Sequence, residues 1–407
     1  MRGLTLIFYV LNWENEMKRE IYLDNAATTK PLDLVAQVVK TTMLDCYGNP
    51  SSLHKKGMEA ETILKEAREV FAQELGALPE EIYYTSGGTE SNNAAIIGAS
   101  MAYRRTGRKI ITSMIEHPSV LEVFKHLQQQ GFEVITIGSD KNGVIDINDL
   151  EKAIDEQTTL VSIMHVNNEI GAIQPIYEIG QLVKRKNKET LFHVDAVQSF
   201  GKLPIHVKKN KIDLLSVSPH KFYGPRGIGL LYKSKAVRLQ PLLFGGGQQN
   251  SLRSGTENVA AVAGTLEALR YMISKREEIL EHMKNCKIYL GQQLLKAISD
   301  CWVNGPSIEE GAPYILNMGI KDVRSEVLLH VLEQEGIYVS SGSACSSHKK
   351  NKDGVLVALG LPKEQLDNAI RFSFAHDTQV EDLETVIEVM KNQIPVLRRY
   401  TPGGGKK

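Results

Sequence analysis

Residues 216–232 read SVSPHKFYGPRGIGLLY. Both ends of this segment are strand-like, and a candidate reactive side chain lies between them. The apolar run at 212–217 predicts one strand, and 228–232 predicts a second. Glycine and proline at 224–227 predict the turn between them. Lys221 follows the first strand, where burial would lower its pKa and suit it to act as an amine nucleophile that forms a Schiff base. A lone lysine in a turn is more often an exposed surface residue, so the assignment of Lys221 as a nucleophile depends on other segments of the chain.

Strand-like segments alternate with amphipathic helix-like segments over most of the chain. Residues 60–75 place apolar side chains at helical spacing, and Gly76 predicts the end of that helix. Pro31 predicts the start of an earlier helix. Further strands are predicted at residues 82–84, 110–112, 134–137, 160–165 and 191–194. This alternation predicts an α/β fold with a mostly parallel sheet that helices cover on both faces.

The pattern changes after about residue 266. A long amphipathic helix is predicted at residues 274–298, and shorter strands and helices follow it. Thr378 and Glu381 match a capping box, which predicts the start of another helix. We expect a smaller α+β domain here, packed with the N-terminal segment. Met17 opens the stretch MKREIYLDNAATT, and we interpret the residues before it as an upstream extension. The predicted parts are an N-terminal extension (1–18), an N-terminal segment (19–31), a large domain (32–267), the smaller domain (268–397) and a flexible tail (398–407).

Charge and cysteine content exclude several classes of protein. The 407 residues carry 48 basic and 48 acidic side chains, so the net charge gives no indication of binding to nucleic acid or to an anionic membrane. The longest apolar run near the start, residues 4–13, is too short to span a bilayer and has no cleavage site after it. Cys46, Cys286, Cys301 and Cys345 are far apart, which argues against disulfides and against a metal site. We therefore expect a cytoplasmic protein without a metal.

Two loops that follow predicted strands suggest anion binding and proton transfer. Residues 86–91, SGGTES, lie between a strand and a helix, where glycine and the helix N-terminus favour a phosphate group. By itself this loop is as often a plain turn with a helix cap. His117 follows the next strand, and its ring is suited to stack on an aromatic ring or to move protons. A lone histidine there is more often a cap or a surface residue.

Two further strand ends carry polar side chains. Asn168 lies in HVNNEIG after the most apolar strand, and such asparagines are often only turn formers. Asp195 lies in HVDAVQ, and burying its carboxylate is costly unless it pairs with a cation such as a protonated pyridine nitrogen. Asp195 and Lys221, on separate strand ends, could flank one ring. With the phosphate loop and the imidazole of His117, they are the parts of a site for pyridoxal 5'-phosphate (PLP).

Nine sequence motifs in order also resemble a known family. The chain is similar to the cysteine desulfurases of the NifS/IscS type, in the class V aminotransferase branch of the fold-type I PLP enzymes. The resemblance covers residues 21–391 and implies a large PLP-binding domain with a seven-stranded, mostly parallel sheet and a smaller α+β domain. The matching motifs are YLDNAATT, YGNPSSLH, TSGGTESNN, EHPSV, HVNNEIG, HVDAVQS, SPHKFYGPRGIG, RSGTEN and SGSAC.

The resemblance implies roles around the cofactor ring. Lys221 resembles the lysine that forms the Schiff base with PLP, and Asp195 resembles the partner of the pyridine nitrogen. His117 resembles the residue stacked on the ring. Gln198 resembles the residue that binds the ring hydroxyl, with Asn168 beside it near the substrate.

The resemblance also implies roles around the phosphate and the substrate. Thr256 in RSGT resembles a residue that reaches the phosphate of the other subunit, which implies a homodimer. Arg371 in RFSF resembles the clamp for the substrate carboxylate, because arginine offers a bidentate fork. The phosphate ligands of the family are matched by Gly88, Thr89, Ser218 and His220.

Cys345 lies among small and polar residues at 340–347, unlike a packed structural cysteine. By the resemblance it is the nucleophile, active as the thiolate, that takes sulfur from L-cysteine as a persulfide and leaves alanine. The resemblance implies sulfur transfer to an acceptor protein, either an iron–sulfur scaffold or a tRNA-thiolation enzyme. The other three cysteines match no motif, and we interpret them as packing or surface residues.

Two other functions stay open. One is a related enzyme on the same scaffold, either a transaminase or a selenocysteine lyase. A transaminase has no need of a thiol in such a loop, whereas the sequence leaves selenocysteine open as a substrate. The other is a sulfur-carrier scaffold with vestigial catalysis, which the loss of Lys221 or Cys345 would have indicated. Both residues are present.

Overall fold

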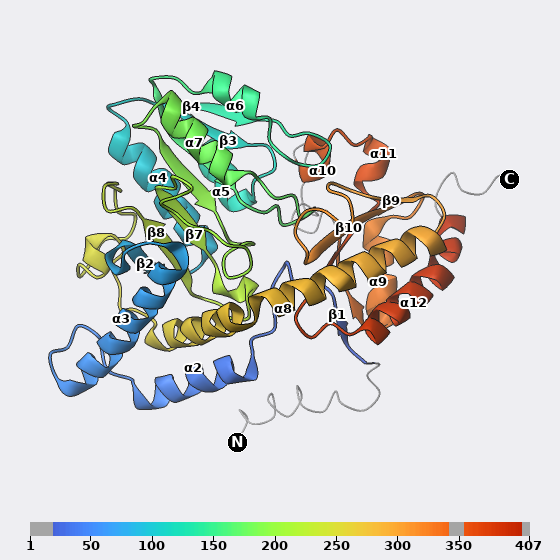
Figure 1. Cartoon of the computed structure of the whole chain (residues 1–407), viewed down its shortest axis with the longest axis horizontal. Coiled ribbons are helices and arrows are strands. Elements are labelled where there is room, and N and C mark those ends of the chain that lie inside the picture. Colours follow the sequence, from blue (N-terminus) through green and yellow to red (C-terminus); the bar gives the residue numbers. More distant parts are fainter. Residues whose placement is uncertain (1–18, 342–353, 401–407) are drawn as a thin grey trace.

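The computed structural model describes residues 19–341 and 354–400 (Figure 1). Its largest sheet has seven strands in the order β2-β8-β7-β6-β5-β3-β4, and only β8 runs antiparallel to its neighbours. This arrangement confirms the predicted mostly parallel sheet. The strands are β2 (Ile82–Thr85), β3 (Lys109–Ser113), β4 (Glu133–Ile137), β5 (Thr158–Met164), β6 (Leu191–Asp195), β7 (Leu214–Val217) and β8 (Gly229–Lys233).

Helices cover both faces of this sheet because its side chains alternate between two apolar clusters. Ile110 packs with α4 (Gly88–Tyr103) and α5 (Pro118–Gln129), whereas the next residue, Ile111, packs in the cluster on the opposite face. That cluster includes α3 (Lys55–Leu75), α6 (Ile147–Ala153), α7 (Ile176–Lys186) and α8 (Val259–Ala297). β5, β6 and β7 are buried along their whole length, as expected for parallel strands covered on both sides.

A second sheet of four strands lies beside the first (Figure 1). The N-terminal segment reaches this region, because β1 (Ile21–Tyr22) pairs in parallel with β11 (Ile337–Tyr338). The order is β12 (Ser340–Ser341), β13 (Ala369–Ser373), β10 (Ile315–Ile320) and β9 (Cys301–Val303). Its helices are α9 (Ser325–Gln334), α10 (Val355–Ala358), α11 (Lys363–Leu366) and α12 (Val380–Arg399).

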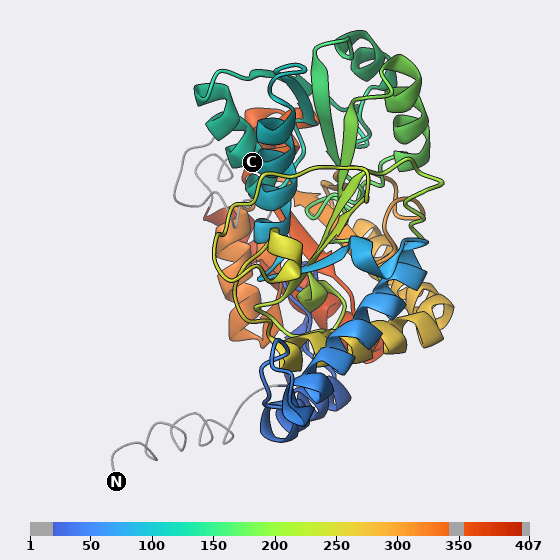
Figure 2. The ribbon, with the colours of Figure 1, turned by 90° about the vertical axis from the view of Figure 1, so that its left-hand side faces the viewer.

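The helix α8 extends along both sheets and links them (Figure 1). Its first half packs against α3 and against α2 (Asp33–Asp45), which Figure 2 shows together at one end of the molecule. The predicted domain boundary at residues 267 and 268 falls inside α8, and the division into domains stays a prediction. None of the helices in the described part of the chain is long and apolar enough to cross a membrane.

Three predictions about helix starts were wrong. The long helix begins at Val259 rather than near residue 274, because its first residues are apolar on all sides and hide the amphipathic pattern; Asn258 caps it. Thr378 does not form a capping box, because its hydroxyl accepts a hydrogen bond from the Ala375 amide and closes the preceding turn. The helix predicted to open at Pro31 begins two residues later, at Asp33.

The parallel strands bring distant residues to one edge of the large sheet. β6 ends at Asp195, β7 leads into the short helix η2 (Pro219–Lys221), and β2 leads into α4. Because β2, β6 and β7 run in the same direction, their carboxyl ends meet at this edge. The predicted site residues on these three strand ends therefore lie close together.

Gly229 allows β8 to pack closely against the 86–91 loop at this edge. A Cβ atom at Gly229 would lie 2.5 Å from both the carbonyl carbon of Gly87 and the hydroxyl of Thr85. Real Cβ atoms do not approach backbone so closely, so β8 can pack beside the 86–91 loop only without a side chain.

We therefore expect Gly229→Ala to lower the free energy of unfolding by about 1–3 kcal/mol, because the loop has to move. Urea unfolding of the purified protein measures this change. The matched control is Gly138→Ala, since a Cβ at Gly138 meets no heavy atom within 4 Å. The control should stay within about 0.5 kcal/mol of wild type. Equal stability of the two variants would contradict the proposed close packing.

Candidate active site

A cavity of about 630 Å³ opens at the carboxyl ends of these strands. Thr256 is exposed and does not line it, and Cys345 lies outside the described residues. Ser340 and Ser341, which directly precede the segment that contains Cys345, do line it. The cavity brings together ten of the predicted site residues: Gly88, Thr89, His117, Asn168, Asp195, Gln198, Ser218, His220, Lys221 and Arg371.

Asp195 is buried on one wall, with 4% of its surface exposed. Its Oδ2 accepts a hydrogen bond from Asn92 Nδ2 at 2.8 Å, and its Oδ1 accepts one from the Val197 amide at 2.9 Å. Both donors are neutral, and no salt bridge to Asp195 occurs among the described residues. A buried carboxylate with neutral donors only is suited to a cationic partner from the cavity.

Lys221 also lines the cavity and is held by the N-terminal segment. Its Nζ donates to the carbonyl oxygens of Ala26 at 2.7 Å and Ala27 at 2.6 Å. Gln198 reaches the same segment, because its Nε2 donates to Ala26 O at 2.8 Å. The other amide atom of that side chain, Oε1, is buried and has no hydrogen-bond partner in residues 19–341 and 354–400.

The start of α4 and His220 also line the cavity, where the sequence predicts a phosphate site. Gly87 precedes α4 without a side-chain cap, so the amides of the first turn are available to an anion. A Cβ atom at Gly88 would lie 2.7 Å from a methyl group of Val197, so the chain passes close to the β6 loop here. Burial lowers the pKa of His220 to about 4, with Lys221 and Arg226 adding to the effect, so its ring is neutral at pH 7.

These residues fit PLP. The unpartnered Gln198 Oε1 is an acceptor for the ring hydroxyl, and Asp195 supplies a carboxylate for the ring nitrogen. The uncapped α4 start offers amides to the phosphate, and the Lys221 amine lies in the same cavity. The match between each donor or acceptor and one group of the cofactor is the structural basis for assigning the cavity to PLP.

Arg371 lines the cavity from β13 of the second sheet and is 7% exposed. Its Nη2 pairs with Asp24 Oδ1 at 2.6 Å, and its Nη1 donates to Asn168 O at 2.7 Å. Towards the described residues, two of the five guanidinium N–H groups are used in this way, and the buried Nε has no partner among them. Donors therefore remain for a substrate carboxylate. Asp24 belongs to the YLDNAATT motif, and its spacing in the sequence did not indicate this contact with Arg371.

Glu169 is a second group that the sequence analysis quoted without a role. Its side chain lines the cavity next to Arg371. Burial raises the pKa of Glu169 to about 7, although the positive charge of Arg371 opposes the rise. The only sequence signal was its place in the HVNNEIG motif.

Lys202 gave no signal in the sequence. It is buried, and its Nζ lies 4.1 Å from the centre of the Tyr314 ring. Burial lowers the pKa of Lys202 to about 7, and the charge of Lys221 adds to the effect. Tyr314 in turn donates to Gln198 O at 2.8 Å, so this buried lysine packs behind the cavity wall.

Glu116 precedes His117 and is buried behind Asp195. Its Oε1 accepts hydrogen bonds from Ser113 Oγ at 2.6 Å and from the Met164 amide at 2.9 Å, while Oε2 is buried and meets no hydrogen-bond partner among the residues that the structure describes. Burial raises the pKa of Glu116 to about 8 despite these bonds, and the charge of Asp195 adds to the rise. The side chain is therefore mainly a neutral acid at pH 7.

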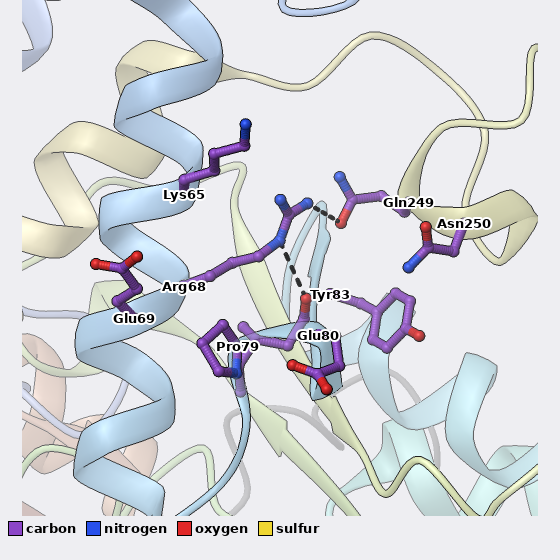
Figure 3. Close-up of a pocket in the computed structure, with 9 residues that line it drawn as sticks. Lys65, Arg68, Glu69, Pro79, Glu80, Tyr83, Gln249 and Asn250 are labelled. Atoms are coloured by element: carbon purple, nitrogen blue, oxygen red, sulfur yellow. Dashed lines mark hydrogen bonds between the residues drawn. The ribbon is translucent and has the colours of Figure 1, made fainter.

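Another cavity, of about 340 Å³, lies between α3, η1 (Pro79–Glu81) and η3 (Gln249–Ser251) and is shown in Figure 3. Arg68 crosses it and donates to Ile82 O and to Gln249 Oε1. None of the predicted site residues lines this cavity. Its strongest donor is already engaged, and we assign it no chemistry.

Glu116 gives a prediction about pH. The folded protein keeps this proton up to about pH 8, whereas the unfolded chain loses it near the ordinary value of 4.5. The contribution of Glu116 to stability is thus fully present below pH 4.5 and is lost as the pH rises to about 8. The Glu116→Gln variant has no carboxyl group at this position, so its stability does not fall with pH for this reason.

The stability of Glu116→Gln relative to wild type should therefore increase between pH 5 and 8, by up to about 1.4 kcal/mol per pH unit. Urea unfolding of both proteins in the same cofactor state measures the difference. Glu156→Gln removes an exposed carboxylate and serves as the control. A Glu116→Gln difference that does not change with pH would contradict the protonated acid.

Comparisons with known proteins agree with this site. The Aminotransferase class-V family matches residues 21–386. A protein named cysteine desulfurase IscS from Dictyoglomus turgidum is 42% identical over 386 residues, which cover 95% of this chain and 97% of that protein. A protein named cysteine desulfurase from Nostoc sp. is 42% identical over 382 residues, 94% of each chain.

Solved structures give the same result. A NifS-like protein matches with a TM-score of 0.87 at 37% identity, over 93% of this chain and all of its own. A structure described as SspA in complex with cysteine matches with a TM-score of 0.76 at 33% identity, over 88% of this chain and 99% of its own. Because one family covers nearly the whole chain in sequence and in structure, the chain belongs to the class-V aminotransferase family of PLP-dependent enzymes.

Proposed function

We propose that this chain is a PLP-dependent cysteine desulfurase that converts L-cysteine into L-alanine and keeps the sulfur as a persulfide on Cys345. The observation that carries this proposal is one cavity with Lys221, Asp195 and an unpartnered Gln198 acceptor, whose rim at Ser340 and Ser341 leads into the segment with Cys345. Two relatives that cover nearly the whole chain are named cysteine desulfurase, which supports this substrate.

The cofactor would be held by Lys221, Asp195, Gln198 and the start of α4, with His117 against the ring. When bound, PLP supplies an electron sink that weakens bonds at the α carbon of an amino acid. Asp195 supports that sink because its buried negative charge favours a protonated ring nitrogen. Thr89, Ser218 and His220 complete the phosphate side.

Arg371 binds the substrate carboxylate with the guanidinium donors that Asp24 and Asn168 leave available. The two partners already orient the guanidinium plane, so little side-chain freedom is lost when the substrate binds. The amine of Lys221 and the ring of His117 lie in the same cavity and move protons to and from the substrate.

Cys345 removes the sulfur. Its thiolate attacks the substrate sulfur, so an S–S bond forms on the enzyme while the C–S bond of the substrate breaks. The bonding electrons stay with the carbon fragment, which takes up a proton and leaves as alanine. The outer persulfide sulfur then passes to an acceptor protein that serves iron–sulfur cluster assembly or tRNA thiolation.

We further propose that the enzyme is a cytoplasmic homodimer with sites that both subunits complete. Thr256 is exposed and lies outside the cavity of its own chain, as a residue that serves a partner subunit would. Large apolar side chains are exposed on and beside the first two helices, and a second copy would bury them. They are Leu34, Met43, Leu44, Tyr47, Leu53 and Met58.

Two alternatives differ in measurable ways. A selenocysteine lyase would release alanine faster from L-selenocysteine than from L-cysteine. A scaffold with vestigial catalysis would release no alanine from either, although it would still carry sulfur. Lys221 and the cavity around it support a working enzyme over the scaffold.

We expect Cys345→Ala to keep PLP and to bind L-cysteine, but to release alanine at least about a hundredfold more slowly, because the sulfur has no nucleophile to receive it. Alanine is measured by amino-acid analysis in the presence of a thiol reductant. Cys46→Ala, at a half-buried cysteine, is the matched control and should retain wild-type turnover. Wild-type turnover in Cys345→Ala would refute the nucleophile.

A further inference from the structure

His117 caps the helix that follows it. Its Nδ1 accepts a hydrogen bond from the backbone amide of Ser119 at 3.1 Å at the start of α5. Pro118 comes between them and has no amide hydrogen, so Ser119 provides the first available donor. The cap fixes which edge of the imidazole faces the helix and assigns Nδ1 the role of acceptor.

A second hydrogen bond at the same nitrogen has a direction that can be worked out. Ser119 Oγ lies 2.8 Å from His117 Nδ1. Asn92 Nδ2 lies 2.9 Å from that hydroxyl and 2.8 Å from Asp195 Oδ2, so its two hydrogens go to these two oxygens. Ser119 Oγ is thus an acceptor towards Asn92, and its own hydrogen is free to point at Nδ1.

The Asn92 amide can adopt only this orientation. Exchanging its nitrogen and oxygen would place Oδ1 against the carboxylate oxygen of Asp195, where two acceptors would repel each other. The present orientation leaves Oδ1 buried and without a partner in the described part of the chain, which is the smaller cost because that atom is neutral.

Because Nδ1 accepts twice, it carries no proton, and the neutral ring has its proton on Nε2. No described residue forms a hydrogen bond with Nε2, and the side chain lines the cavity. Burial also lowers the pKa of His117, the charge of Lys221 adds to this effect, and Asp195 opposes it. Burial and the charge of Lys221 therefore favour the neutral ring.

We propose that Asn92 and Ser119 are positioning residues that hold His117 as the Nε2–H tautomer and link its ring to Asp195, the carboxylate that faces the cofactor. These residues form a chain of hydrogen bonds, here called the relay, that runs Asp195–Asn92–Ser119–His117. Its three contacts are 2.8, 2.9 and 2.8 Å long. This proposal rests on the proposed function only for the part that the His117 proton takes in the reaction. In the resting enzyme Nε2 carries the proton and donates a hydrogen bond into the cavity, so Lys221 rather than His117 takes the first proton from the substrate.

The tautomer is tested by nitrogen NMR on the PLP-loaded enzyme labelled with ¹⁵N-histidine. The chain has 11 histidines, and the His117→Gln spectrum identifies the missing signal. We expect a protonated Nε2 and an unprotonated, hydrogen-bonded Nδ1 for His117 in the wild type. A proton on Nδ1 would overturn the proposal, and the tautomer is read from the wild-type spectrum, with His117→Gln used only for assignment.

The relay is tested by Ser119→Ala, with Ser119→Thr as the conservative control. Ser119→Ala should shift the Nδ1 signal towards that of an unbonded ring nitrogen and lower kcat about fivefold, with KM within about twofold of wild type. Ser119→Thr should restore both. An unchanged Nδ1 signal in Ser119→Ala would overturn the relay. Alanine release by the wild type tests the proposed function separately, since the spectra report the tautomer whether or not the enzyme turns over cysteine.

Discussion

The carboxylate of Asp195 is buried at the end of β6, and the rest of the site is arranged around the cost of that burial. An unpaired buried charge costs several kcal/mol, and the Asn92 and Val197 donors are neutral. A cationic ring nitrogen in the cavity would offset this cost, which connects the stability of the loaded protein to the chemistry of its cofactor. Glu116, buried nearby, limits the cost by remaining protonated rather than adding a second charge.

Two sheets and the short N-terminal segment that connects them place the other groups of the site around Asp195. The parallel strands of the large sheet place Asp195 and Lys221 at the same edge. The N-terminal segment then connects the edge to the second sheet: Ala26 accepts from Lys221 and Gln198, and Asp24 holds Arg371 on β13. A displacement of this segment would therefore disturb the cofactor side and the substrate side together.

Sequence patterns predicted much of this arrangement and missed the rest for physical reasons. Apolar runs located the central strands, and polar residues at their ends located Asp195 and Lys221, because parallel strands share a direction. The roles of Asn92, Glu116 and Lys202 depend on which side chains meet across elements, and spacing along the chain carries no information on that. The start of α8 was missed because Val259 and its neighbours are buried all round. The assignment of Cys345 rests on its motif, since it lies outside the described residues.

The central claim is that the buried Asp195 keeps the cofactor ring cationic. The most direct measurement is the ¹⁵N NMR signal of PLP labelled at its ring nitrogen and bound to the wild type and to Asp195→Asn. We expect a protonated ring nitrogen in the wild type and an unprotonated one in Asp195→Asn, because the amide offers no negative charge. An unprotonated nitrogen in the wild type, or the same protonated signal in both proteins, would contradict it.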